Sequence, residues 1–329
     1  MRSSWIQIFC VAAFCAATSP AVWAQGTPAK DYPTRVIRVV IPFGAGAGPD
    51  VVGRIFADKM GPSLGQNFVF ENRLGGGGSI GTAAVAKAPP DGYTLLLNVA
   101  AYATYPYFIK NLPYDPWKDL IPVTLMARNV GFLLAVNPSL PVRSVKELIA
   151  LGKANPGKLN YGATGVGSVS QMAAELFAQA AGIKLTAIQY TGVPAMLSDT
   201  ISGQIDLSFP AAPSALPFAG AGRLRALGIT AEKRWKKMPD VPTLAEAGVK
   251  GYKYDGWYGL WFPAGTPAVY VSRIQGEVVK ALNDPMVRQR LDDQGLIGIG
   301  STPEEFAKVL EAEFALNKKL TASMGLVPQ

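Results

Sequence analysis

The 329-residue sequence contains no histidine, and its only two cysteines, Cys10 and Cys15, lie in an apolar stretch near the N-terminus. Without histidine there can be no Ser-His triad and no imidazole ligand for a metal ion. If the apolar stretch is removed, the remaining chain also lacks disulfides, thiolate nucleophiles and cysteine-bound metals. A metal could then be held only by oxygen ligands. No clustered Asp/Glu motif predicts such a site, and we expect no metal and no cofactor.

Charge is also sparse, because only 16% of the residues are charged and the net charge is +8. The positive charges are scattered, and the densest run covers residues 233–237. One such run in an exported protein is weak evidence for nucleic-acid binding, and we expect no nucleic-acid partner. The positive charge can be explained by a solvated surface without a function, or by a mild attraction of small anions.

The first 24 residues have the organisation of a secretory signal peptide. Arg2 supplies a positive charge, residues 5–17 are apolar and uncharged, and Val22-Trp23-Ala24 provides a cleavage site. The apolar run is too short to favour a transmembrane anchor, and the surroundings of Cys10 and Cys15 do not favour a lipoprotein signal. We therefore expect cleavage near Ala24 and export to the periplasm.

The stretch 35–50 predicts a strand, a glycine loop and the start of a helix. Branched apolar residues fill positions 36–41, and Gly44, Gly46 and Gly48 allow a tight turn that exposes backbone N–H groups. Pro49 and Asp50 suit the first turn of the helix that follows. The unpaired N–H groups of such a helix start form an anion site without a charged side chain.

The same order of elements recurs twice. A strand at 68–70 leads through the glycines of 75–81 into a helix at 82–87, and a strand at 159–161 leads through the small residues of 162–168 into a helix at 169–181. Further strands are predicted at 93–99, 132–136, 187–190, 205–209, 225–229 and 252–262. This alternation predicts βαβ units and a mostly parallel sheet.

Residues 76–81 formally match the pattern G-x-G-x-x-G after a strand, so a dinucleotide site is one interpretation. The acidic residue expected about 20 positions later has only a poor candidate, because Asp91 lies in a turn before a strand. A second interpretation is that these glycines only form tight turns. Three separate loops of this kind fit a ligand cleft better, since such loops lie at the carboxyl ends of strands in an open α/β sheet.

The sequence resembles the Bug/TctC family, the periplasmic solute-binding receptors of the tripartite tricarboxylate transporter system. The matching stretches include Ile41-Pro42-Phe43-Gly44-Ala45-Gly46, Glu71-Asn72-Arg73-Leu74-Gly75-Gly76-Gly77-Gly78, Pro90-Asp91-Gly92-Tyr93-Thr94-Leu95-Leu96 and Pro239-Asp240-Val241-Pro242-Thr243. Shorter matches lie at 32–33, 160–162, 165–168, 214–217, 224–227, 246–248 and 301–306, so the resemblance covers nearly the whole chain after the signal.

The resemblance implies an α/β, two-domain periplasmic-binding-protein fold of type II, the Venus-flytrap arrangement, with a ligand cleft between the domains. We expect domain 1 to comprise residues 33–129 and 251–329, and domain 2 residues 130–250, with a hinge near 128–129 and 254–256. The implied function is capture of a small organic carboxylate and its delivery to the membrane permease subunits of a tripartite tricarboxylate transporter, by a monomer that is not an enzyme.

The resemblance also implies that backbone N–H groups of loops 43–48 and 75–78 hold one carboxylate, partly through water. The exit of the third strand and the loop 163–168 would complete the pocket. The candidate ligand-binding residues are Phe43, Gly44, Ala45, Gly46, Gly48, Asp50, Gly76, Gly77, Gly78, Ser79, Asn98, Ala100, Ala101, Thr104, Ala163, Thr164, Gly165, Gly167, Ser168 and Pro210.

The chain departs from the family pattern at four positions. Gln171 stands where histidine is common, Pro210 stands where an acidic residue is common, and Tyr102 and Tyr105 stand in a segment that is usually rich in Ser, Thr and Gly. A less acidic and more aromatic pocket would favour an aromatic or apolar carboxylate over an amino acid. Alternatively, Tyr102 and Tyr105 pack in the core of their domain.

Two other functions remain open from the sequence. An exported α/β hydrolase or isomerase would need a base or nucleophile from Asp, Glu, Lys or Tyr. The acidic candidates Asp50, Glu175, Asp206 and Asp255 show no spacing that pairs them. A solute sensor that works without a permease would share every feature of a transport receptor.

Overall fold

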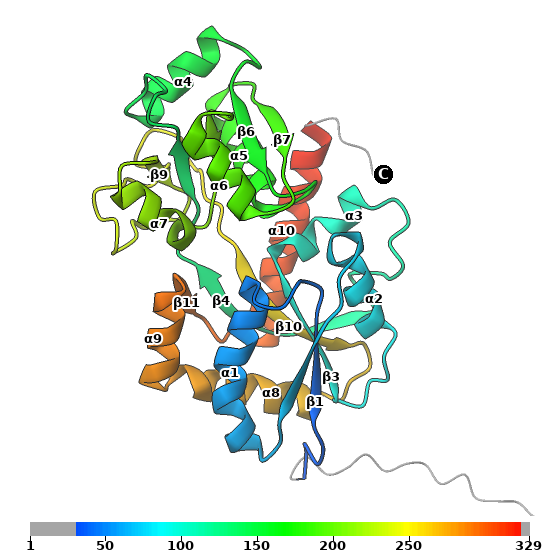
Figure 1. The fold of residues 1–329 in the computed structure, drawn as a ribbon. Coiled ribbons are helices and arrows are strands. Elements are labelled where there is room, and N and C mark those ends of the chain that lie inside the picture. The colour runs from blue at the N-terminus through cyan, green and yellow to red at the C-terminus, as the bar shows by residue number, and fades with distance from the viewer. Residues whose placement is uncertain (1–30, 324–329) are drawn as a thin grey trace, which may run out of the picture.

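The computed structural model describes residues 31–323, which form two α/β units, each built on its own mixed sheet (Figure 1). The predicted signal peptide lies outside the described residues. The strand order of the first sheet is β11-β4-β10-β3-β1-β2. Its strands are β1 (Ile37–Ile41), β2 (Phe68–Asn72), β3 (Thr94–Val99), β4 (Leu120–Asn129), β10 (Trp257–Pro263) and β11 (Leu296–Gly298).

The prediction of a mostly parallel sheet is wrong. β1 pairs in parallel with β2 and β3, as expected, but β10 is antiparallel to both β3 and β4. The chain leaves this sheet at the end of β4 and re-enters it at the start of β10, where Trp257 pairs with Arg128. Because β4 ends and β10 begins at the same edge of the sheet, these two neighbouring strands must run in opposite directions.

β4 was not predicted from the sequence, and β10 is shorter than the strand predicted at 252–262. Pro122 interrupts the strand pattern of β4, since proline cannot donate to a ladder. The structure accommodates it where Pro122 pairs with Trp261, next to a register irregularity between Leu260 and Trp261. Residues 252–256, predicted as part of a long strand, instead form the irregular crossing that precedes β10.

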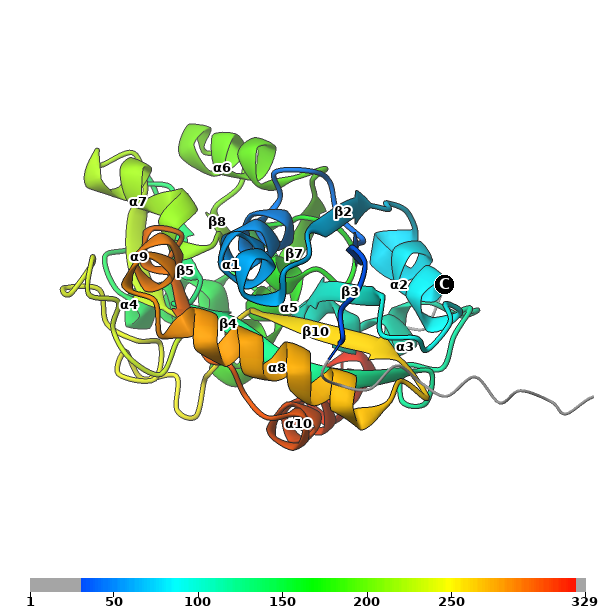
Figure 2. The ribbon, with the colours of Figure 1, turned by 90° about the horizontal axis from the view of Figure 1, so that it is seen from below.

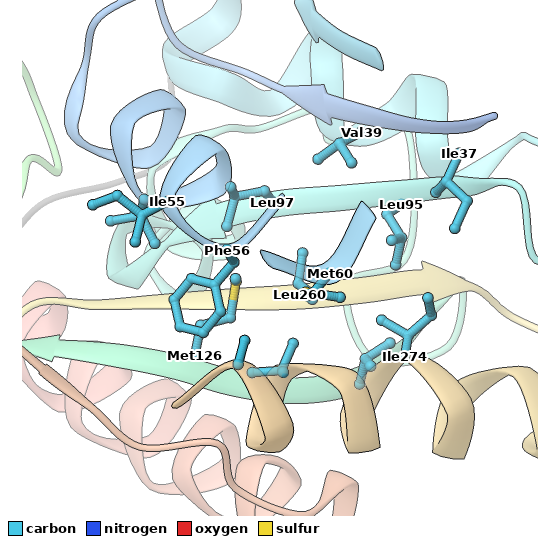
Figure 3. Close-up of a cluster of buried hydrophobic side chains, with 14 of the residues drawn as sticks. Ile37, Val39, Ile55, Phe56, Met60, Leu95, Leu97, Met126, Leu260 and Ile274 are labelled. Carbon is cyan, nitrogen blue, oxygen red and sulfur yellow. The ribbon is translucent and has the colours of Figure 1, made fainter. Parts of the chain in front are cut away.

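Helices cover both faces of the first sheet (Figures 1 and 2). On one face lie α1 (Gly48–Leu64), α8 (Ala268–Leu282) and α9 (Pro285–Asp293). Figure 3 shows Phe56 and Met60 of α1 and Ile274 of α8 meeting strand residues such as Leu97 and Leu260. On the other face, α2 (Ser79–Ala86) and α10 (Pro303–Ser323) enclose a second apolar cluster around Trp257 and Trp261.

The second sheet has the order β7-β6-β8-β5-β9. Its strands are β5 (Leu133–Val136), β6 (Asn160–Ala163), β7 (Thr186–Gln189), β8 (Leu207–Ser208) and β9 (Arg225–Ile229). The helices α4 (Val145–Ala154) and α5 (Val169–Ala181) contribute to the apolar cluster on one side, and α6 (Val193–Ser202) and α7 (Ala212–Gly220) contribute to another. No helix among residues 31–323 combines the length and apolar character that a membrane crossing requires.

Three segments connect the two units. The chain passes up between β4 and β5 and returns through residues 252–256, while α10 runs alongside both units (Figure 1). Phe306 and Phe314 of α10 pack in the first unit, whereas Leu320 packs in the second. An ion pair joins the two crossings, because Arg128 Nη1 lies 2.7 Å from Asp255 Oδ1.

A second carboxyl group, that of Glu313 on α10, lies close to this ion pair. The pKa of Glu313 is raised to about 7, chiefly by burial and also by the nearby charge of Asp255, against the opposing effects of Arg128, Trp257 and Lys253. Burial also raises the pKa of Asp255. The ionised form of Glu313 therefore destabilises the folded protein at the place where the two units connect.

Replacing Glu313 with Gln should stabilise the protein at pH 7 to 8. A carboxyl group whose pKa is raised on folding stabilises the folded state below its ordinary pKa of 4.5, and this stability is lost as the pH rises towards 7. Allowing for partial solvent exposure, we expect a gain of about 1–2 kcal/mol at pH 8 and almost none at pH 4.5. Urea unfolding at several pH values measures it.

The matched control is Glu311→Gln, because Glu311 is exposed on the same helix. This variant should follow the pH dependence of the unsubstituted protein. Equal pH profiles for Glu313→Gln and the unsubstituted protein would show that Glu313 is solvated rather than buried.

Candidate ligand-binding cleft

A cleft of about 870 Å³ lies between the two units. The first unit lines it with the segments that follow β1, β2 and β3, and the second unit with the segments that follow β6, β7 and β8. Asn129 and residues 256–258, from the two crossings, complete it. Ligand contacts at this position would involve both units and the segments that connect them.

Thirteen of the twenty predicted site residues line the cleft: Phe43, Gly44, Gly76, Gly77, Gly78, Ala100, Ala101, Thr104, Thr164, Gly165, Gly167, Ser168 and Pro210. The other seven, Ala45, Gly46, Gly48, Asp50, Ser79, Asn98 and Ala163, do not line it. Those seven lie in or beside the same loops, so the sequence located the loops but not which of their residues face inwards.

Asp50 supports the first loop from behind. Its carboxylate accepts hydrogen bonds from the Gly46 N–H (3.0 Å) and from Arg54 Nε and Nη2 (2.9 and 3.1 Å). The hydrogen bond from Arg54 is the main cause that lowers the pKa of Asp50, and it outweighs the opposing effect of burial. The charge of Asp50 is therefore compensated by these donors. In the same loop, the N–H of Gly44 lines the cleft and has no acceptor among residues 31–323.

The second loop consists of four consecutive glycines, 75–78, all with positive φ between 56° and 121°. Only glycine adopts such a run without strain. The turn directs the carbonyl of Gly75 towards the N–H groups of Gly78 and Ile80. The N–H groups of Gly76 and Gly77 are left without an acceptor in the described part of the chain.

The third loop, 163–168, is held by side chains of the helix that follows it. The Gly167 N–H donates to Gln171 Oε1 (2.8 Å), the Thr164 N–H donates to Ser170 Oγ (3.0 Å), and Ser168 Oγ caps α5 by accepting from the Gln171 N–H. Gln171, where the family pattern often has histidine, therefore fixes the loop and does not line the cleft.

Sequence reasoning missed a fourth helix start in the cleft, that of α6. Thr191, Gly192 and Val193 line the cleft, and α6 begins there without a side-chain cap. Gly192 followed by Pro194 at the start of the helix was the available signal. Among residues 31–323, α1, α2, α3 (Tyr105–Phe108) and α7 also start at cleft-lining residues without a side-chain cap, although at α7 the Ala212 N–H donates to the Gly131 carbonyl.

No charged side chain lines the cleft among residues 31–323. Its wall combines aromatic and aliphatic side chains, including Phe108, Phe132 and Met196, with small residues of the glycine loops. An anion bound here would meet backbone N–H groups and hydroxyls instead of cations. An ammonium group would find no carboxylate.

The two tyrosines after β3 take different places. Tyr102 is fully buried in the core, where its hydroxyl donates to the carbonyl of Pro116 (2.5 Å). Tyr105 belongs to the same apolar cluster but also borders the cleft. Its hydroxyl is buried behind Gly78 and has no hydrogen-bond partner in the part of the chain that the structure describes, and burial raises its pKa. Tyr102 therefore packs in the core of its domain, which is the second of the two alternatives given for it above, and does not line the pocket.

The two walls touch at one end of the cleft. Thr104 Oγ1 donates to the carbonyl of Gly167 across the gap (3.3 Å). Phe108 lies so close to Gly167 that a methyl group there would stand 3.0 Å from its ring. These contacts join the first unit to the third loop in the observed conformation.

Comparison with known proteins gives a consistent result. The family model described as "Tripartite tricarboxylate transporter family receptor" matches residues 52–326. Protein BugT of Bordetella pertussis is 34% identical over 284 residues, which are 86% of this chain and 87% of BugT.

Two solved structures from Rhodopseudomonas palustris are similar throughout. Rpa4515, solved with adipate, is 35% identical with a TM-score of 0.80, covering 91% of this chain and 100% of that one. MatC, solved with bound malate, is 32% identical with a TM-score of 0.75, covering 88% of this chain and 100% of that one. With its two sheets, this chain therefore has the two-domain binding-protein fold that the sequence predicts.

Replacing Gly78 with Ala should distort the glycine loop. At φ 112° an alanine is strained, and its methyl group would overlap the Tyr105 hydroxyl. We expect a loss of about 2–4 kcal/mol in the free energy of unfolding, measured by urea denaturation. Adding Tyr105→Phe to this variant should restore part of the loss, because the overlapping oxygen is gone.

Gly44→Ala is the control for stability, since a methyl group at Gly44 would meet no atom within 4 Å and its φ is not in the left-handed region. Its free energy of unfolding should stay within about 0.5 kcal/mol of the unsubstituted protein. A Gly78→Ala variant as stable as Gly44→Ala would contradict the described loop geometry.

Proposed function

This chain belongs to the TctC family of tripartite tricarboxylate transporter receptors, and on that premise we propose that it captures a small carboxylate through the backbone N–H groups of its glycine loops. Its relatives and structural neighbours are solute-binding receptors and not enzymes. The chain is accordingly a solute-binding receptor, which removes the hydrolase and isomerase alternatives.

The observation that carries the proposal is the set of unpaired donors in an uncharged cleft. The N–H groups of Gly44, Gly76 and Gly77 have no acceptor among residues 31–323. Helix starts favour negative charge, because their unpaired N–H groups carry partial positive charge. A carboxylate would supply acceptors for several of these donors at once, directly or through water.

The cleft favours a carboxylate whose remaining atoms are apolar. An amino acid would bury its ammonium group against a wall to which residues 31–323 contribute no carboxylate, and a buried unpaired charge is costly. The neighbour solved with adipate, a dicarboxylate with an apolar chain, supports this class. Aromatic acids fit it equally, since Phe43, Phe108 and Phe132 contribute to the wall.

Binding would be coupled to closure of the two domains. We propose that residues 33–129 with 251–329 and residues 130–250 move as two bodies about a hinge at 128–129 and 254–256. A ligand that contacts both walls favours the closed state, because only that state makes both sets of contacts. The closed receptor, acting as a monomer in the periplasm, would then deliver its ligand to membrane permease subunits.

Thermal unfolding of the ligand-stripped protein tests this function. The panel contains succinate, adipate, citrate, glutamate, nicotinate, benzoate and terephthalate. A carboxylate at ~100 times its dissociation constant should stabilise the protein by ~2.7 kcal/mol, which raises Tm measurably. We expect adipate, benzoate or terephthalate to raise Tm and glutamate to have no effect.

Benzamide is the matched control for benzoate, since it keeps the ring and removes the charge. No shift with any carboxylate would contradict the proposed function. A shift with glutamate alone would retain the receptor function but contradict the role assigned to the uncharged wall.

A further inference from the structure

Tyr258 lies in the cleft but outside the set of residues predicted from the sequence. It is on β10, immediately after the crossing that connects the two units. Its ring packs against the main apolar cluster of the first unit. The hydroxyl reaches the start of α1, where a methyl group on Gly48 would stand 2.6 Å from the Tyr258 oxygen. Glycine at position 48 therefore makes room for this hydroxyl.

Among residues 31–323, the hydrogen-bonding neighbour of the Tyr258 hydroxyl acts as a donor to its oxygen, since it lowers the pKa, and the O–H itself has no acceptor there. Its polar neighbour is the side-chain amide of Asn129, which also lines the cleft. Burial raises the pKa of Tyr258 to about 12, with Asn129 acting in the opposite direction. The phenol is thus neutral and protonated at physiological pH, which makes it a donor beside a helix start.

An O–H group without an acceptor among residues 31–323 has a clear use in this place. The uncharged wall provides no cation for an anionic ligand, and the neighbouring loop already presents the free N–H of Gly44. A hydroxyl can donate one strong hydrogen bond to a carboxylate, and hydrogen bonds to a charged group are roughly twice as strong as neutral ones.

We propose that the Tyr258 hydroxyl is the side-chain donor that binds the ligand's carboxylate beside the start of α1. This inference rests on the proposed function and adds to it a specific recognising side chain. It also connects recognition with closure. Tyr258 and Asn129 adjoin the two crossings, so a carboxylate held there contacts the segments about which the units would move.

The test is the substitution Tyr258→Phe, which keeps the buried ring and removes only the oxygen. Isothermal titration calorimetry measures the dissociation constants of adipate and benzoate for both proteins. For whichever of these two ligands the unsubstituted protein binds, we expect Tyr258→Phe to bind it at least about 10-fold more weakly. This is the expected effect of losing a hydrogen bond to a charged group.

The matched control is Tyr114→Phe. Tyr114 is a buried tyrosine whose hydroxyl has no hydrogen-bond partner among residues 31–323, and it does not line the cleft. This variant should bind with unchanged affinity. A second readout separates recognition from packing: if Tyr258 recognises the charge, the preference for benzoate over benzamide falls in Tyr258→Phe, whereas a packing defect weakens both ligands equally.

The outcomes separate this inference from the function on which it rests. If the unsubstituted protein binds a carboxylate and Tyr258→Phe binds it equally well, the Tyr258 inference is wrong and the receptor function stands. If the unsubstituted protein binds no carboxylate of the panel, both fail. Equal weakening of benzoate and benzamide would also overturn the role of the hydroxyl.

Discussion

The cleft depends on backbone N–H groups that the fold leaves without acceptors. Elsewhere in a protein an unpaired N–H away from water is costly, so most helices cap their first turn. Here α1, α2 and α6 begin without a side-chain cap at one cleft, and no cationic side chain of the described residues lines it. Two of the residues that expose these donors, Gly76 and Gly77, have positive φ, and the small size of all these glycines leaves room for a ligand to approach the backbone.

The polar side chains around the cleft hold the loops in place. Asp50 ties the first loop through the Gly46 N–H, Thr82 ties the second through the Gly78 carbonyl, and Gln171 ties the third through the Gly167 N–H. Each bond fixes one backbone group of its loop, while the N–H groups of Gly44, Gly76 and Gly77 keep no acceptor among residues 31–323. The loops are therefore arranged before a ligand arrives, and little ordering entropy is lost on binding.

Sequence reasoning located these loops because glycine runs after apolar strands carry a strong local signal, and the resemblance to the family gave the two-domain fold. It could not determine which loop residues face inwards. Asp50 fits an anion-site motif by position, yet its pairing with Arg54 turns it away from the cleft. Nor could it find β4, whose pattern Pro122 interrupts, or the antiparallel entry of β10. The direction of β10 is set by its pairing with β3 and β4, which are distant in the sequence, so the residues around β10 do not reveal it.

The most direct test of the account is the amide ¹H–¹⁵N spectrum of the ligand-stripped protein during titration with adipate or benzoate. A carboxylate held by the backbone should move the amide protons of Gly44, Gly76 and Gly77 downfield, as hydrogen bonds to a charged acceptor form. The amide of Gly46, already bonded to Asp50, should move less. Saturable binding that leaves all three of these glycine amides unshifted would contradict recognition by backbone donors, even if the protein is a carboxylate receptor.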